Sequence, residues 1–266
     1  MVDWNKNKKF KFFKEETLKK NIIFIVIGFL ILFTMFGCDG GGIIPDDDNN
    51  NDDSNMIKNT VLIEAYIAVG CSACAKVEPI LEQLVNEYSR EEMILVEIDP
   101  WSDYHTVETS QRYKWYGLTG GVPQILFNGL NNNIAGSSGA TYSAIKSRIE
   151  AQLAINPTIK LEASRTTTSS GTVISGKVKN ISSNTLTNLV VNGMVFKDMG
   201  KVGFRYTVTD IFEDEKIVIS SLAPGEEKDF TMTIAGLKWG TKDDGVIFVQ
   251  SIADPKKTIR QSVFLD

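Results

Sequence analysis

The sequence predicts an α/β domain followed by an all-β domain, both placed behind an N-terminal export segment. Three observations lead to this prediction. An uncharged, mostly apolar run occupies residues 21–37, strand and helix patterns alternate over residues 58–155, and short strand patterns separated by turn residues fill residues 156–266. Alternating strands and helices favour a sheet covered by helices, whereas many short strands favour an antiparallel sandwich.

The composition fits a globular chain and excludes some classes of protein. The 266 residues are 42% hydrophobic and 23% charged, with a formal net charge of -5. That acidic balance argues against nucleic acid as a partner, because a protein that neutralises phosphates needs a basic surface. One histidine and three cysteines exclude a histidine-rich metal site and a multi-disulfide scaffold.

Residues 1–38 are predicted to be a lipoprotein signal peptide or membrane anchor. Lysines dominate residues 6–20, before the apolar run that ends at Cys38. A basic stretch followed by an apolar one is typical of a secretory signal. Phe36-Gly37-Cys38 resembles a bacterial lipobox, which implies lipidation of Cys38, and an uncleaved signal-anchor helix is the alternative. Both readings place the protein in the bacterial cell envelope, tethered to a membrane and facing the periplasm or the exterior.

Residues 39–57 are predicted to form a flexible acidic linker, because glycine, aspartate and asparagine dominate them. A calcium site at Asp46-Asp47-Asp48 and Asp52-Asp53 is the alternative, although the ligand spacing of a calcium loop is missing. The linker would hold the folded part of the chain away from the membrane.

Residues 58–155 carry the predicted chemistry. A strand pattern at residues 60–67 leads to Cys71 and Cys74, and apolar residues at helical spacing follow over residues 75–89. The cysteines thus lie where a strand ends and a helix begins, and the free N–H groups and dipole of a helix start lower a thiol pKa. We expect Cys71 to be the nucleophile and Cys74 to resolve the mixed disulfide.

The remaining patterns of this region complete the α/β order. A second strand is predicted at residues 93–98, a helical stretch at residues 102–116, and a third strand after Pro123. Proline in a strand is confined to starts, edges and bulges, so Pro123 is placed at the start. A final amphipathic helix is predicted at residues 142–154, which gives a sheet with helices on both faces.

Residues 58–155 resemble thioredoxin. The resemblance rests on Cys71-Ser72-Ala73-Cys74 after a strand, on Pro79 inside the following helix, and on Gly121-Val122-Pro123 before a strand that ends in Phe127-Asn128-Gly129. It implies a cis bond between Val122 and Pro123 beside the cysteines. It also implies that Val122 and Pro123 bind the substrate segment, and that no external cofactor or metal is needed.

The sequence departs from thioredoxin at several positions. Gly70 replaces the tryptophan before the first cysteine, and Ser72-Ala73 replaces Gly-Pro between the cysteines. The buried acid that assists proton transfer in thioredoxin would fall at Ala65 and is missing there. Glu64, one residue away and on the opposite face of a strand, is either a catalytic group or a solvated residue at a strand end.

Other readings of the cysteine pair stay open. The pair could form a static disulfide, or could bind zinc, for which Cys38 and His105 are the remaining Cys or His ligands. A copper site of Cys71, Cys74 and His105 is another alternative. We favour a redox-active dithiol without metal, with His105 as an exposed loop residue.

Residues 156–266 are predicted to form an all-β, immunoglobulin-like sandwich. A turn at residues 221–226 resembles those that join strands in immunoglobulin-like domains, and we find no catalytic constellation in this region. Eight short strand patterns support the sandwich, at residues 159–163, 172–178, 189–196, 204–208, 216–219, 229–234, 246–250 and 259–264.

The sequence therefore favours an enzyme, namely a membrane-anchored, extracytoplasmic thiol–disulfide oxidoreductase. Its partners would be cysteine-containing envelope proteins and an unidentified redox partner. The alternative is a binding or adhesion lipoprotein in which the thioredoxin-like region is an inert scaffold with a structural disulfide, because a fold does not by itself imply a function.

Overall fold

The computed structural model describes residues 57–265, which belong to one compact unit of the chain. Cys38, the predicted export segment and all but the last residue of the predicted linker lie outside the described residues. Within residues 57–265, no helix has the length and apolar character needed to cross a bilayer.

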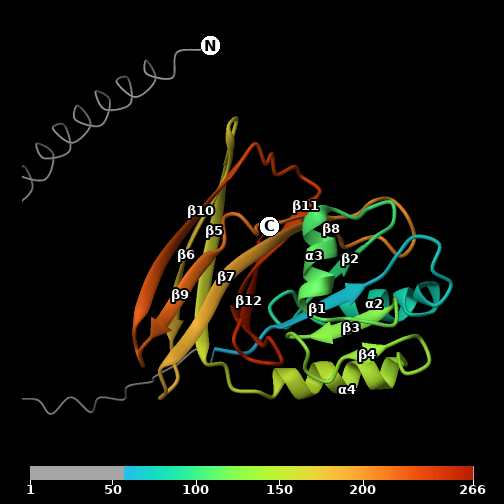
Figure 1. Cartoon of the computed structure of the whole chain (residues 1–266), viewed down its shortest axis with the longest axis horizontal. Coiled ribbons are helices and arrows are strands. Elements are labelled where there is room, and N and C mark those ends of the chain that lie inside the picture. The colour runs from blue at the N-terminus through green and yellow to red at the C-terminus, as the bar shows by residue number, and fades with distance from the viewer. Residues whose placement is uncertain (1–56, 266) are drawn as a thin grey trace, which may run out of the picture. The chain divides into compact units, whose positions relative to one another are not determined.

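A mixed sheet of nine strands runs through the described part of the chain (Figure 1). Its order is β12-β11-β7-β8-β2-β1-β3-β4, and β9 pairs with a further part of β7. β1 is parallel to β2 and antiparallel to β3. The strands from the first half of the chain are β1 (Val61–Tyr66), β2 (Met93–Ile98), β3 (Gln124–Phe127) and β4 (Ile134–Ala135).

The helices cover both faces of this part of the sheet, as the alternating pattern predicts. Tyr113 and Tyr116, at the end of α3, pack with Leu62 and Tyr66 on one face. Side chains of α2 and α4 pack with Val61, Ile63 and Ala65 on the other. The helices are α2 (Glu78–Val85), α3 (Val107–Trp115) and α4 (Tyr142–Leu153), with a short 3-10 helix at Cys74–Lys76.

The helix predicted for residues 75–89 is divided in the structure. The 3-10 helix ends at Lys76, and α2 begins at Glu78 with Pro79 in its first turn. Proline is tolerated there because the first N–H groups of a helix have no partner within it. Pro79 therefore marks the start of α2 instead of kinking a longer helix.

Each of the eight strands predicted after residue 156 overlaps a strand of the structure. The mixed sheet takes up five of them: β7 (Leu186–Lys197), β8 (Thr207–Ile211), β9 (Ile217–Leu222), β11 (Asp243–Ser251) and β12 (Ile259–Leu265). The other three form an antiparallel sheet in the order β10-β6-β5: β5 (Ile159–Thr168), β6 (Gly171–Asn180) and β10 (Glu227–Ala235).

The arrangement of these strands corrects the predicted immunoglobulin-like sandwich, which the structure does not clearly show. β8 joins the edge of β2, where Glu97 lies opposite Thr207 in the register. The N–H of Glu97 donates to the carbonyl of Tyr206 at 2.8 Å, so the sheet continues from one half of the chain into the other. An unpaired edge of β2 would expose hydrogen-bonding groups, and β8 satisfies them. Strand patterns alone do not reveal this pairing.

The strands β7 and β11 separate two cores. Along β11, Val246 and Phe248 face the core that includes α3, whereas Ile247 and Val249 face the core beneath the three-stranded sheet. A strand sends successive side chains to opposite faces, so a continuous apolar run fits a strand that is buried on both sides.

Candidate functional site

Cys71 and Cys74 form a disulfide just after β1, with a Cα–Cα distance of 5.2 Å. Cys74 is fully buried, whereas Cys71 is partly exposed. The backbone N–H of Cys74 points at Sγ of Cys71, with an N–S distance of 3.1 Å. A backbone N–H aimed at a sulfur favours its negative form, so this geometry suits Cys71 as the thiolate.

Val122 and Pro123 lie beside the disulfide. The bond between them is cis, as the resemblance to thioredoxin implies. The carbonyl oxygen of Val122 is 3.7 Å from Sγ of Cys71. The four predicted site residues therefore come together in space, with Cys71 next to a backbone segment that a bound polypeptide could pair with.

Phe204 is a site residue that the sequence analysis missed. It is 6% exposed and shares an apolar cluster with Ile67 and Cys74, to which Tyr104 and Met199 add partly buried side chains. Phe204 belongs to the loop between β7 and β8, more than a hundred residues from the cysteines along the chain. No local pattern marks it, because its contact with Cys74 depends on the pairing of β8 with β2.

Two buried carboxyl groups lie under the same loop. Burial raises the pKa of Glu97 to about 8, helped by the charges of Glu78 and Glu82 and opposed by the hydrogen bond from Tyr206. Burial raises the pKa of Glu78 to about 7, with a smaller contribution from Glu82. The Oε2 of Glu97 accepts the N–H of Tyr206 at 2.8 Å, and within residues 57–265 its Oε1 is buried with no hydrogen-bond partner.

The position of Glu97 bears on the missing acid of the resemblance. In the parallel pairing of β1 and β2, Glu97 lies directly beside Ala65. A buried carboxyl thus occurs on the neighbouring strand β2, whereas the resemblance places it on β1. The signal for it in the sequence is Glu97 itself, the one charged residue in an otherwise apolar strand.

Glu64 is neither solvated nor part of the disulfide site, which corrects the prediction of a solvated strand end. It is fully buried, its Oε1 pairs with Nε of Arg112 at 2.5 Å, and its Oε2 accepts the hydroxyl of Tyr116 at 2.6 Å. A buried charge requires such a partner and such hydrogen bonds. Gln250 of β11 extends this network by donating to the Tyr116 hydroxyl at 2.8 Å.

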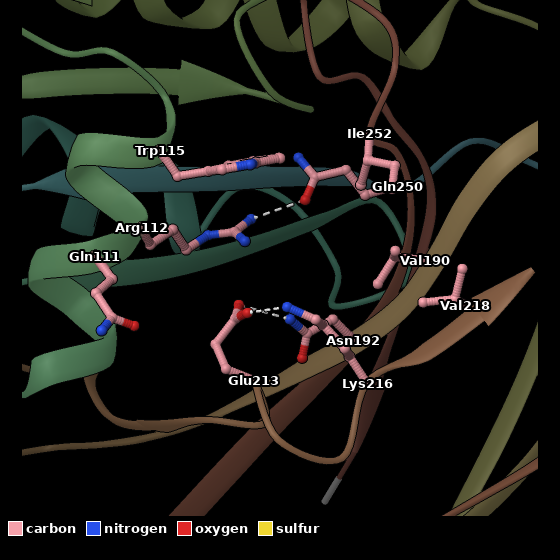
Figure 2. A pocket seen from close by; sticks show the side chains of 10 residues that line it. All are labelled: Gln111, Arg112, Trp115, Val190, Asn192, Glu213, Lys216, Val218, Gln250 and Ile252. Carbon is pink, nitrogen blue, oxygen red and sulfur yellow. Dashed lines mark hydrogen bonds and ion pairs between the residues drawn. The ribbon is translucent and has the colours of Figure 1, made fainter.

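A hollow of about 300 Å³ lies beside this network. Figure 2 shows that Arg112 and Trp115 reach it from α3, and that Gln250 accepts a hydrogen bond from Arg112 across it. On its other side Glu213 accepts hydrogen bonds from Asn192 and Lys216. Of these hydrogen bonds, the one between Arg112 and Gln250 joins the two halves of the chain, and those of Glu213 lie within the β-rich half.

Both metal alternatives include His105, and Cys38, the other ligand of the zinc alternative, lies outside the described residues. His105 is exposed in the loop before α3, as predicted. Among the residues that the structure describes, no group of three or more His, Cys, Asp and Glu side chains could hold a metal ion.

The structure is defined by a mixed α/β sheet that continues into a β-rich half, together with a small antiparallel sheet. The chain is similar to HBP35 of Porphyromonas gingivalis, with a TM-score of 0.62 and 15% identity over 78% of this chain and 75% of that one. At that identity the likeness shows the fold alone.

Two further structures match about two fifths of the chain. One is a domain of the outer membrane lipoprotein Omp28 from Porphyromonas gingivalis, with 18% identity, a TM-score of 0.30, and coverage of 41% of this chain and 86% of that one. The other is the Malassezia sympodialis thioredoxin Mala s 13, with 18% identity, a TM-score of 0.28, and coverage of 38% and 83%.

Comparison by sequence gives one family match. Residues 135–240 match the model of a family described as a protein of unknown function, DUF2393. The match covers less than half of the chain and spans residues from both halves. No curated protein matches the sequence.

Proposed function

We propose that the protein is a thiol–disulfide oxidoreductase that acts on cysteines of other envelope proteins. The observation that carries this proposal is the asymmetry of the cysteine pair: Cys71 is partly exposed beside the Val122 carbonyl, and Cys74 is buried behind it. An exposed attacking thiol with a sheltered second thiol suits two successive exchange reactions.

In the direction of reduction, the thiolate of Cys71 attacks one sulfur of a substrate disulfide. An S–S bond forms between Cys71 and the substrate, the substrate S–S bond breaks, and the leaving thiolate takes up a proton. The thiolate of Cys74 then attacks Sγ of Cys71, which forms the Cys71–Cys74 disulfide and releases the second substrate thiol. Two electrons pass from the protein to the substrate, and a partner dithiol must restore the reduced form.

The carboxyl group of Glu97 lies beside Ala65 on the neighbouring strand, and with a pKa raised to about 8 it would be the group that exchanges protons in these steps. A group that gains and loses a proton near the working pH is suited to general acid–base catalysis. Val122 and Pro123 would align the substrate segment through the backbone, and the chain needs no external cofactor for these steps.

The cellular setting is part of the proposal. The lysine-rich segment, the apolar run and Cys38 support export and attachment to a membrane through a lipid or an anchor helix. The envelope is also where protein disulfides form and persist, so substrates for exchange are available there.

The test is disulfide exchange by the full chain in detergent, with insulin as substrate and dithiothreitol as reductant. We expect the wild type to reduce insulin faster than dithiothreitol alone, and Cys71→Ser to lose this activity. Cys74→Ser should accumulate a mixed disulfide with insulin on a non-reducing gel. Cys38→Ser is the matched control and should keep the activity.

An opposite result would favour the alternative of a binding lipoprotein with a structural disulfide. In that case the wild type would show no exchange above the dithiothreitol background, and Cys71→Ser would instead lower the stability of the fold. A short disulfide loop contributes at most about 2–3 kcal/mol in this way.

A further inference from the structure

The loop between β7 and β8, residues 198–206, lies over the disulfide. Its Phe204 packs against Ile67 and Cys74, and the centres of the Phe204 and Tyr104 rings are 5.2 Å apart. Figure 1 draws this orange loop beside the cyan turn that follows β1 and carries the cysteines. A segment of the β-rich half therefore forms one wall of a site whose sulfur atoms belong to the other half.

The loop is held by a hydrogen bond within itself and by two contacts of its C-terminal end with the α/β half. Met199 donates its N–H to the carbonyl of Phe204 at 2.9 Å, which closes the loop on itself. Tyr206 donates its N–H to the Glu97 carboxyl at 2.8 Å, and Arg205 pairs with Glu82 at 3.3 Å. These contacts hold Phe204 in position independently of any substrate.

A glycine allows the loop to approach α2 closely. Gly203 has a φ of 81°, a conformation that residues with a side chain rarely adopt. A Cβ atom at this position would overlap the carboxyl group of Glu78. The close contact between the loop and α2 thus depends on the absence of a side chain at Gly203.

We propose that this loop shields Cys74 from outside reagents and leaves Cys71 as the single point of attack. The inference rests on the proposed function and deepens it. With Phe204 over Cys74, a mixed disulfide at Cys71 is released by Cys74 from within, and other thiols cannot engage Cys74 in its place. Phe204 acts as a positioning residue, because it shares the buried apolar cluster of the resolving cysteine and takes no part in the exchange itself.

The experiment measures alkylation of the reduced full chain by iodoacetamide, with each cysteine followed by peptide mass spectrometry. Cys71 in the wild type should react at least about tenfold faster than Cys74. In Phe204→Ala the rate at Cys74 should rise by about tenfold while the rate at Cys71 changes little, because opening the cover exposes only the buried thiol.

Three variants separate shielding from a general loss of packing. Phe230→Ala also removes a buried phenylalanine, but from the three-stranded sheet, and should leave the ratio of the two rates unchanged. Phe204→Leu keeps an apolar side chain over Cys74 and should restore most of the protection. Gly203→Ala, which pushes the loop away from Glu78, should raise labelling of Cys74 in the same direction as Phe204→Ala.

The proposal is overturned if the ratio of the Cys71 rate to the Cys74 rate in both Phe204→Ala and Gly203→Ala equals that of the wild type. The α/β half alone would then bury Cys74. A rise in the Cys74 rate of Phe230→Ala equal to the rise in Phe204→Ala would overturn it as well. Alkylation needs no substrate, so these outcomes stand apart from the insulin assay. If the wild type does not reduce insulin but Cys74 is still shielded, only the proposed function is refuted.

Discussion

Two buried carboxyl groups lie where the β-rich half meets the α/β half, and they are stabilised in opposite ways. Glu64 is paired with Arg112 and accepts a hydrogen bond from Tyr116, so both of its oxygens are used. Glu97 accepts the N–H of Tyr206, and no cation contributes to the causes that shift its pKa. Glu64 is compensated by an opposite charge, whereas Glu97 is stabilised by keeping its proton.

The difference indicates what each contact does. The charge-compensated network joins α3 to β11 through the hydrogen bonds of Gln250 with Arg112 and Tyr116. A carboxyl group with a pKa of about 8 changes its charge near neutral pH, and it lies at the base of the loop that covers the disulfide. The Glu64 contact therefore serves mainly stability, and the Glu97 contact can respond to conditions at the site.

The largest expected effect comes from breaking the compensated contact. Arg112→Ala leaves Glu64 buried without its cation, and such a change costs about 3–5 kcal/mol of unfolding free energy. The double variant Glu64→Leu with Arg112→Met should lose less than Arg112→Ala, because no charge is left buried. Urea unfolding followed by circular dichroism measures both.

Lys177→Ala is the control for the Arg112 prediction. Lys177 pairs with Glu227 on the exposed surface of the three-stranded sheet. An exposed pair contributes little, so the unfolding midpoint should stay near that of the wild type. If the unfolding midpoint of Arg112→Ala also stays near that of the wild type, the account of the Glu64 network is contradicted.

The next effect is a pH dependence of stability from Glu97. Its pKa is raised from 4.5 in the unfolded chain to about 8 in the fold, so the folded state binds the proton more tightly. The stabilisation is complete below about pH 4.5 and is lost as the pH rises through about 8. Because one pKa unit equals about 1.4 kcal/mol and about three units separate pH 5 from the folded pKa, we expect a loss on the order of 4 kcal/mol between pH 5 and pH 9.

Glu97→Gln provides the check on this pH dependence. The amide oxygen can still accept the N–H of Tyr206, but the side chain no longer titrates. We expect the decline in unfolding free energy between about pH 5 and pH 9 to become clearly smaller. A decline as steep as that of the wild type would show that Glu97 is not its source, and Glu78, with a pKa of about 7, would be examined next.

The smallest expected effect is the difference in stability between two glycine variants of the loop, which separates steric crowding from backbone strain. Gly203→Ala and Gly200→Ala both place a side chain at a positive φ, but only a Cβ at Gly203 meets the Glu78 carboxyl group, and nothing lies within 4 Å at Gly200. Each should lose about 1 kcal/mol from strain, and Gly203→Ala should lose about 1 kcal/mol more. Equal unfolding midpoints would argue that Glu78 moves aside freely.

Much of the α/β half could be predicted from the sequence because its signals are local. The strand before Cys71, the cysteine spacing and the Gly121-Val122-Pro123 segment each depend on neighbouring residues, and all of them appear in the structure. The resemblance also implied the cis bond, which is present. The strands of the second half were likewise indicated by local alternation of apolar and polar residues.

The connection between the halves could not be predicted, because it depends on contacts between residues that are distant in the chain. Strand patterns do not say which edges pair. The sequence therefore predicts a separate sandwich, whereas the structure joins β8 to β2 at Glu97. Phe204 was missed for the same reason. Glu64 was misplaced because a charged residue in a strand pattern does not reveal that Arg112, from α3, will neutralise it.

The most direct test of the central claim is the reduction potential of the Cys71–Cys74 pair in the full chain, equilibrated in glutathione buffers. The account predicts a redox-active pair, with a potential between roughly -270 and -120 mV. A value near the lower limit would indicate a reductase, and one near the upper limit an oxidase. A pair that stays oxidised below about -300 mV would be a structural disulfide and would contradict the proposed function.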